Sequence, residues 1–265
     1  MSFDAGACRS RLDTRWIGRR LEVWPELEST NDEAWDLLAA GAAVGTVIVA
    51  DVQTRGRGRS GRTWHQAPRR GLALSVLLLP RERCPLTLVP LLAGLGLAEG
   101  LESLSVETEL KWPNDVLIGG RKVAGVLCES RSGSGPARTV VMGVGVNVAE
   151  GPEDFPPEIQ GSATSLRIEG NDLGREEVAA AFLNRLERLW ILAEERGGAP
   201  IVEGWRRRAT FWGRRVAVAT RSGRLAGVAE DLDAEGRLLV QLDAGGRAAL
   251  WAGDLELDPG MRIER

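Results

Sequence analysis

The 265-residue chain, with 43% hydrophobic and 27% charged residues, has the composition of a globular protein of one large domain, alone or with a small appendage. Its formal net charge of -3 argues against general coating of nucleic acid, and it has no uncharged run of the ~20 residues that span a bilayer. The three cysteines are scattered, His65 is the only histidine, and the N-terminus lacks the apolar core of a signal peptide. We therefore expect a cytoplasmic protein with no membrane partner, no metal-ligating residues and no catalytic triad.

The first predicted element is a helix over residues 29–41, STNDEAWDLLAAG. Thr30 followed by Glu33 fits a capping box, and Gly41 is a typical residue at which a helix stops. These signals predict that the helix begins close to residue 29 and ends close to residue 41.

Alternating, β-branched and apolar runs predict the elements that follow. The predicted strands are 46–51, 72–80, 106–111, 115–118, 122–129 and 138–148, and the predicted helices are 85–104, with an early kink at Pro90, and 174–196. Gly119–Gly120 and SGSGP at 132–136 mark hairpin turns. Successive hairpins after a helix predict an α+β fold with a largely antiparallel sheet.

From Arg214 the pattern changes to short strands separated by glycine-containing turns. RRVAVAT, LAGVAEDLD, RLLVQLD and RAALWAG are the strand-like runs, and RSG, AEG and AGG are the turns between them. This pattern predicts a small β-barrel of roughly 50 residues. We accordingly divide the chain into a catalytic domain, 1–212, and a small second domain, 213–265.

The stretch TRGRGRSGRTW, residues 54–64, concentrates arginine and glycine. Seven arginines and no carboxylate occur between Val52 and Arg81, although the chain as a whole is slightly acidic. Glycine lets a backbone approach a ligand, and guanidinium groups match phosphate or carboxylate oxygens. The stretch therefore predicts an anion-binding loop, and the alternative is a solvated arginine-rich turn without a ligand.

Lysine is almost absent from the chain. Of 34 basic residues only Lys111 and Lys122 are lysines, which makes each a candidate for chemistry that a guanidinium cannot perform. Lys111 opens the stretch KWPND, 111–115, in which proline, asparagine and aspartate are ordinary turn residues. A turn alone does not account for a lysine and a tryptophan immediately before it.

Other polar and aromatic residues allow two interpretations each. The STN stretch, 29–31, either caps the first helix or meets a polar ligand at its N-terminus. Asn147 either makes a turn or points into a site at the end of its strand. Trp64 either joins the core or covers a ligand ring beside the arginines. His65 we interpret as structural.

Taken in order, these motifs closely resemble the biotin–protein ligase family, from about residue 28 to about residue 255. The motifs are STND (29–32), Q-T-x-GRGRSGRTW (53–64), KWPND (111–115), RKVAGVLCES (121–130) and GVGVN (143–147). The type that the chain resembles is a biotin–[acetyl-CoA-carboxylase] ligase without an N-terminal DNA-binding domain, because only about 28 residues precede the first helix. The resemblance implies a mixed-sheet catalytic domain related to class II aminoacyl-tRNA synthetases, followed by an SH3-like barrel.

The implied activity has two steps. Biotin and ATP form biotinyl-5′-AMP, and a lysine of a biotin carboxyl carrier protein or domain of acetyl-CoA carboxylase then displaces AMP. Mg²⁺ is expected with ATP, no DNA partner is expected, and homodimerisation is left open. A glycine-rich loop that closes over the reactive adenylate would exclude water, and its arginines would neutralise phosphate charge.

The family pattern also implies roles for particular residues. The implied biotin-binding residues are Ser29, Thr30, Asn31, Gln53, Arg57, Gly58, Arg59 and Lys111. The implied ATP-binding residues are Arg59, Arg62, Trp64 and Asn147, and the implied catalytic residues are Lys111, Arg57 and Arg59. Ser60 departs from the basic or bulky residue that many relatives carry there, which leaves the detailed contacts of the loop open.

We consider three alternative functions for the same sequence. A lipoate or octanoate ligase or transferase shares the fold, but KWPND argues against it. A biotin-responsive repressor needs an N-terminal DNA-binding domain, and the roughly 28 residues before the first predicted helix are too few to form one. A nucleic-acid-binding module fits the arginines alone, yet the remainder of the chain is acidic.

Overall fold

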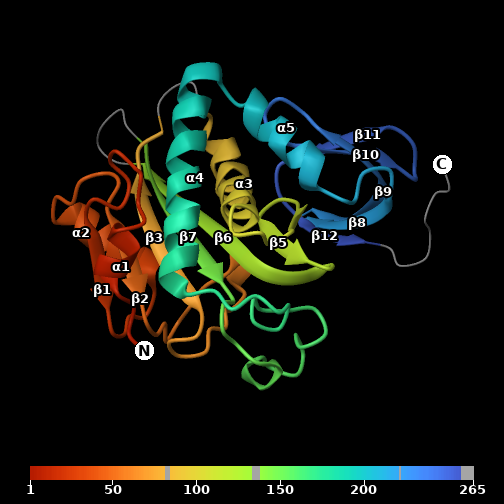
Figure 1. Ribbon diagram of the computed structural model, residues 1–265. Helices are drawn as coiled ribbons and strands as arrows, with labels where there is room; N and C mark the ends of the chain where they lie inside the picture. The colour runs from red at the N-terminus through yellow and green to blue at the C-terminus, as the bar shows by residue number, and fades with distance from the viewer. Residues whose placement is uncertain (81–83, 133–137, 221, 258–265) are drawn as a thin grey trace.

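The computed structural model describes residues 1–80, 84–132, 138–220 and 222–257. Its larger unit is a seven-stranded mixed sheet in the order β1-β2-β3-β7-β6-β5-β4 (Figure 1). The strands are β1 (Leu21–Trp24), β2 (Val47–Ala50), β3 (Leu72–Leu78), β4 (Glu109–Lys111), β5 (Asp115–Ile118), β6 (Arg121–Ser132) and β7 (Arg138–Val146). Only β1 and β2 pair in parallel, and each of the other neighbouring pairs is antiparallel.

Helices cover both faces of this sheet. The helices are α1 (Ala5–Arg9), α2 (Thr30–Ala39), α3 (Val89–Glu102), α4 (Arg175–Arg196) and α5 (Ala199–Arg208). Because side chains alternate along a strand, Val47 and Val49 join the core under α3 and α4, whereas Ile48 joins a second apolar cluster with Trp35 of α2. Figure 1 shows α3 and α4 side by side in front of β6 and β7. The face that carries α2 is therefore covered less fully.

The predicted strands and the three predicted helices are all present, and the sheet is largely antiparallel as expected. The capping box is wrong: α2 has Ser29 at its N-cap with no side-chain cap bond, because the Thr30 hydroxyl bonds to Gln53 instead. Pro90 does not kink its helix, since it lies in the first turn of α3, where its missing N–H has no partner to lose. The SGSGP turn lies largely outside the described residues.

The sequence patterns missed the helices α1 and α5 and the strands β1 and β12 (Asp254–Leu257). β1 is only four residues long at the sheet edge, so it shows little alternation. α5 begins directly after α4 and was not separated from the segment that leads to the second unit. These elements depend on tertiary contacts more than on a local pattern.

The C-terminal unit is a five-stranded antiparallel sheet in the order β11-β10-β9-β8-β12. Its strands are β8 (Arg215–Thr220), β9 (Gly223–Leu232), β10 (Leu238–Leu242), β11 (Arg247–Leu250) and β12 (Asp254–Leu257). Buried residues of β8 to β10 belong to the same apolar cluster as α3 and α4. The buried Trp112 also donates a 3.2 Å bond from its indole Nε1 to the carbonyl of Gly236. The two units therefore form one continuous body.

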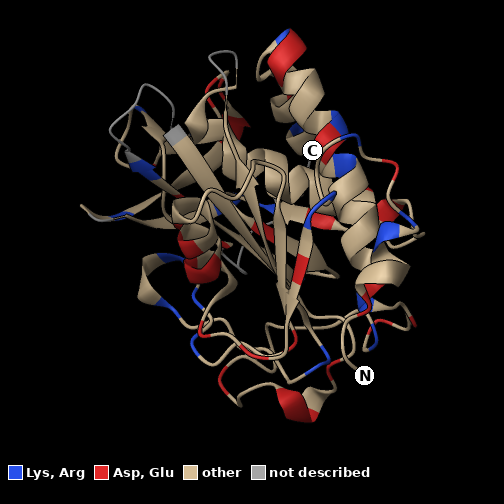
Figure 2. Ribbon diagram, turned by 90° about the vertical axis from the view of Figure 1, so that its left-hand side faces the viewer, with Lys and Arg blue, Asp and Glu red and all other residues tan. Residues whose placement is uncertain are grey.

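Charged residues lie mainly on the helices and loops, and the central strands carry few of them (Figure 2). None of the helices in the described ranges is long and apolar enough to cross a membrane. The arginine-rich stretch between β2 and β3 thus stands out as a concentrated positive segment beside central strands that carry few charges.

Candidate functional site

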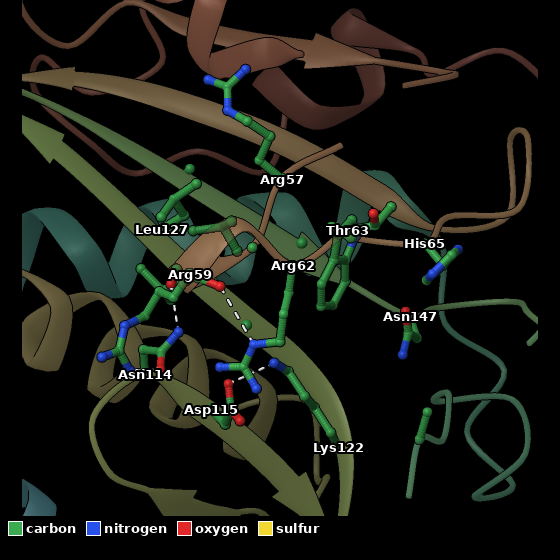
Figure 3. Close-up of a pocket in the computed structure, with 18 of the residues that line it drawn as sticks. Arg57, Arg59, Arg62, Thr63, His65, Asn114, Asp115, Lys122, Leu127 and Asn147 are labelled. Atoms are coloured by element: carbon green, nitrogen blue, oxygen red, sulfur yellow. Dashed lines mark hydrogen bonds and ion pairs between the residues drawn. The ribbon is translucent and has the colours of Figure 1, made fainter. Parts of the chain in front are cut away.

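A pocket of about 560 Å³ lies on the α2 face of the sheet (Figure 3). Its walls come from the start of α2, the loop between β2 and β3, the turn between β4 and β5, and the strands β6 and β7. The sequence-derived candidates that line it are Ser29, Thr30, Asn31, Gln53, Arg57, Gly58, Arg59, Arg62, Trp64, Lys111 and Asn147. All these candidate residues are thus brought together in one place.

Three glycines on β6 and β7 create the depth of the pocket. Gly125, Gly143 and Gly145 occupy strand positions whose side chains would point into the pocket. Because glycine has no side chain, these positions leave space there. A Cβ on Gly143 would lie 2.3 Å from Asn31 Oδ1, and a Cβ on Gly145 would lie 2.3 Å from the Trp64 ring. The glycines therefore let Asn31 and Trp64 lie directly against the sheet.

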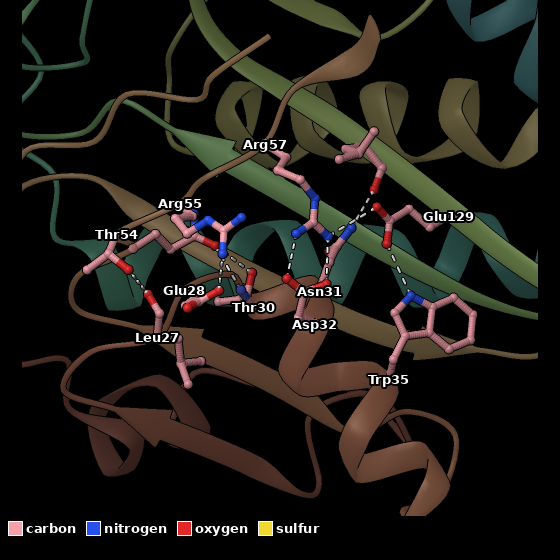
Figure 4. Close-up of polar contacts among 12 residues, drawn as sticks. Leu27, Glu28, Thr30, Asn31, Asp32, Trp35, Thr54, Arg55, Arg57 and Glu129 are labelled. Carbon is pink, nitrogen blue, oxygen red and sulfur yellow. Dashed lines mark hydrogen bonds and ion pairs between the residues drawn. The ribbon is translucent and has the colours of Figure 1, made fainter. Parts of the chain in front are cut away.

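A buried polar cluster occupies the pocket end beside the N-terminus of α2 (Figure 4). The Thr30 N–H and hydroxyl both donate to Gln53 Oε1, at 2.9 and 3.1 Å. Ser75 of β3 lies 2.7 Å from the Thr30 hydroxyl and 2.7 Å from Asn31 Oδ1. These contacts orient the side chains, and the helix N-terminus adds a positive electrostatic potential for an acceptor group.

The arginine loop, residues 54–64, folds as a tight hairpin. The N–H of Trp64 donates to the carbonyl of Gly56, and the N–H of Gly58 donates to that of Arg62. The tip is a short 3₁₀ turn in which Ser60 takes a φ of 55°. Ser60 is thus one of three non-glycine residues with a positive φ among the described residues, with Arg69 and Ser105. The hairpin directs successive arginine side chains to different parts of the site.

Two arginines of the loop already face carboxylates. Arg57 makes a bidentate pair with Asp32 of α2, at 2.5 and 2.8 Å, and a longer contact with Glu129 (Figure 4). Its hydrogen bonds hold the pKa of Asp32 below the usual range. Arg62 reaches the C-terminal sheet, where it contacts Asp254 at 2.5 Å. Arg57 therefore anchors the loop to α2, and Arg62 anchors it to the second unit.

Arg59 and Lys111 differ from Arg57 and Arg62 in that neither forms an ion pair among the described residues. Arg59 donates to two neutral oxygens, Asn114 Oδ1 at 2.9 Å and the Gly253 carbonyl at 3.5 Å, and burial lowers its pKa. Lys111 ends β4 at the pocket wall, and within the described residues it has no carboxylate partner. The carboxylates of Asp254 and Asp115 lie near enough to Arg59 to favour its charged form, although neither forms a direct ion pair with it. An anionic ligand would give each of the two cations a direct partner.

The opposite end of the pocket combines aromatic, cationic and apolar groups. Lys122 pairs with Asp115 at 2.6 Å, and its Nζ lies 5.5 Å from the centre of the Trp64 ring. Asn147 is not in a turn but lines the pocket, and its Nδ2 donates a 2.8 Å bond to the Thr164 carbonyl. Apolar side chains of Phe155, Ile159 and Ala163 complete this end, which suits a flat ring with polar edges.

Several residues of the site were not identified from the sequence. Ser75 supports the polar cluster, Asn114 contacts Arg59, and Asp254 contacts Arg62 from nearly 200 positions away. His65, which we interpreted as structural, is exposed on the pocket rim. Only the position of Asn114 within KWPND offered a signal, and it was explained there as a turn residue.

Two family models match the chain. The model described as the biotin/lipoate A/B protein ligase family matches residues 23–147, which include all the pocket motifs. The pocket-lining residues beyond this match are Phe155, Ile159, Ser162 and Ala163. The model described as the biotin protein ligase C-terminal domain matches residues 211–257, the region of the second sheet.

Similar whole proteins cover nearly the full chain. The biotin–[acetyl-CoA-carboxylase] ligase of Mycobacterium tuberculosis is 37% identical, over 89% of this chain and 88% of that protein. The bifunctional ligase/repressor BirA of Bacillus subtilis is 35% identical, over 94% of this chain and 77% of that protein. The solved biotin protein ligase of Aquifex aeolicus, in complex with biotin and ATP, superposes with a TM-score of 0.77 at 30% identity, over 91% of this chain and 99% of that one.

Proposed function

Because the chain belongs to the biotin–protein ligase family, we propose that its pocket activates biotin with ATP and passes it to a lysine of a biotin carboxyl carrier domain. Oxygen of the biotin carboxylate attacks the α-phosphorus of ATP, and pyrophosphate leaves to give biotinyl-5′-AMP. The carrier lysine amine then attacks the acyl carbon, loses a proton, and AMP leaves as the amide forms. The observation that supports this most is the pair of cations without a direct ion pair, Arg59 and Lys111, beside a buried polar cluster.

The polar cluster suits the ureido group of biotin. Ser29, Thr30, Asn31 and Gln53 offer both donors and acceptors at the closed end of the pocket, and the ureido group needs both. Placing the ring there directs the biotin tail along the sheet towards Lys111. We therefore assign this end of the pocket to biotin.

The carboxylate and the α-phosphate would meet beside Lys111 and Arg59. Both groups are anionic, so their approach is opposed by charge repulsion that the two cations reduce. Gly58 lets the loop backbone come close to the same junction. Arg57, with its two carboxylate contacts, holds the loop against α2 and contributes to this geometry from one side.

The remaining end of the pocket is assigned to the nucleotide. Arg62, Trp64 and Asn147 line this end of the pocket together with apolar residues. We assign the phosphates to Arg62, the base to the Trp64 side and the sugar to Asn147. Among the described residues, no three or more histidine, cysteine or acidic side chains are grouped so that they could hold a metal ion. Asp115 is the only carboxylate among the described pocket-lining residues. This fits Mg²⁺ that enters with ATP, is held mostly by phosphate and water oxygens, and neutralises phosphate charge.

The finer features of fold and partner are also part of the proposal. We assign residues 1–212 to a ligase domain of the class II synthetase type and 213–265 to an SH3-like barrel, supported by the largely antiparallel first sheet and the five-stranded second one. The proposed partner is the carrier domain of an acetyl-CoA carboxylase, in the cytoplasm where ATP is available. No DNA partner is proposed, because the arginine loop lines the ligand pocket.

Biotin-dependent exchange of labelled pyrophosphate into ATP tests the activity directly. We expect exchange with biotin and Mg²⁺, and transfer of biotin to a carrier domain in a second assay. Lipoate and octanoate are the comparison substrates, because the matched family model includes lipoate enzymes. Exchange with lipoate or octanoate but not with biotin would replace the proposal by the alternative, and no exchange with any acid would refute both.

Gly143→Ala is expected to weaken biotin binding about tenfold or more, because the added methyl group must displace Asn31 from the polar cluster. Calorimetric titration with biotin measures the change. Gly174→Ala is the matched control, since its Cβ would meet only Glu176 Oε2 at 3.6 Å, an ordinary contact at the start of α4. Equal biotin affinity in Gly143→Ala and the parent would remove Asn31 from the biotin site.

A further inference from the structure

Asn114 is held rigidly in the turn between β4 and β5. It is only 8% exposed, and its side-chain Nδ2 donates a 2.7 Å bond to the carbonyl of Val126 in β6. Its own main-chain carbonyl accepts from the Val126 N–H at 3.1 Å. Main chain and side chain are therefore both tied to the same residue of the neighbouring strand.

This attachment determines which way the amide faces. If the amide were reversed, Asn114 Oδ1 would face the Val126 carbonyl, and two acceptors would oppose each other. The Nδ2 group must therefore point to β6. Asn114 Oδ1 in turn points to the guanidinium of Arg59, whose Nη1 donates to it at 2.9 Å (Figure 3).

The partner of Arg59 differs in charge from those of its neighbours in the loop. Arg55, Arg57 and Arg62 each form an ion pair, with Glu28, Asp32 and Asp254 respectively. Arg59 donates its hydrogen bonds to the neutral oxygens of Asn114 and Gly253. The carboxylates of Asp254 and Asp115 attract it only from beyond direct contact. A neutral acceptor fixes the direction of a guanidinium but leaves its positive charge available to a second, anionic partner.

We propose that Asn114 is a positioning residue that aims the Arg59 guanidinium at the anionic junction of the two substrates without neutralising it. The inference deepens the proposed ligase function and depends on it. An aspartate has almost the same shape, but it would compensate the charge of Arg59 and place a carboxylate against the Val126 carbonyl. The turn therefore needs the amide for two separate reasons.

A double-mutant cycle tests whether Asn114 acts through Arg59. We expect Asn114→Ala to lower kcat/KM for ATP in biotin-dependent pyrophosphate exchange by about tenfold, the usual scale for a hydrogen bond to a charged group. In the Arg59→Gly background the same substitution should cost less than about twofold, because its target is gone. Equal losses in both backgrounds would show a merely structural role and overturn the proposal.

Asn114→Asp tests the need for a neutral acceptor. Asn114→Asp retains an oxygen for Arg59, and we expect its activity to be no higher than that of Asn114→Ala. Parent-like activity would overturn the proposal.

Asn184→Ala and Asn184→Asp are the control variants, since the Asn184 amide likewise accepts from one N–H and donates to one carbonyl, but at the exposed surface of α4. Asn114→Ser replaces Asn114→Ala in the cycle if thermal unfolding shows that the alanine variant is not folded. Absence of exchange in the parent would instead refute the ligase function itself.

Discussion

Lys111→Arg is expected to reduce the rate of biotinyl-adenylate formation on the order of a hundredfold, while the affinity for biotin changes far less. Lys111 ends β4 opposite Asp115, yet the carboxylate of Asp115 is 2.6 Å from Lys122 and is already compensated. The ammonium of Lys111 thus remains available to the ligands. A compact ammonium can lie between two oxygens, whereas a planar guanidinium prefers one bidentate face.

The larger side chain must find space in a crowded part of the pocket. Lys111 lines the same pocket as Arg59 and Asn114, so we expect a guanidinium there to move either the biotin carboxylate or the α-phosphate. A misplacement of ~1 Å is enough for a loss of the expected size. The polar cluster that we assign to the ureido ring lies at the α2 end and should be little disturbed.

Single-turnover adenylate formation and biotin titration measure the two quantities separately. Lys122→Arg is the matched comparison, because it changes the other lysine of the chain, and its ion pair with Asp115 can be kept by a guanidinium. We expect the smaller loss there. If Lys111→Arg forms the adenylate at nearly the parent rate, the hypothesis that this position requires an ammonium group is wrong.

Much of the architecture could be predicted because it depends on local patterns. The buried strand 72–80 and the amphipathic helix 174–196 have strong periodicity, and both were found within two residues of the expected bounds. The glycines of GVGVN have a clear use once β7 is placed, since Gly143 and Gly145 face the pocket. The candidate residues that the motifs supplied all line one pocket.

The contacts that orient the site residues could not be predicted in the same way. Arg62 meets Asp254 only because the C-terminal sheet packs beside the loop, and no local pattern connects two residues so far apart. Thr30 was interpreted as a helix cap, but β3 brings Ser75 within reach of its hydroxyl. Each of these side chains had a reasonable local partner, and the tertiary structure supplied a different one.

Arg59→Gly should still form the adenylate but should release it about tenfold faster or more. The substitution removes a cation at the proposed phosphate position, while Lys111 and the polar cluster remain to bind the substrates. It also removes the bonds from Arg59 to Asn114 and to Gly253, so the loop tip loses contacts with both units. Weaker retention and a looser loop act in the same direction, because each allows the mixed anhydride to leave before the carrier arrives.

Released biotinyl-5′-AMP acylates exposed amines without any need for a carrier fold. The measurement is therefore the biotinylation of a bystander protein such as serum albumin, alongside the rate of adenylate formation. Arg55→Gly is the matched control, since it removes an arginine from the same loop whose partner is the exposed Glu28, outside the pocket. We expect bystander labelling from Arg59→Gly and none above the parent level from Arg55→Gly. Strictly carrier-dependent labelling by Arg59→Gly, at comparable adenylation rates, would mean that retention of the intermediate depends on other groups in the pocket.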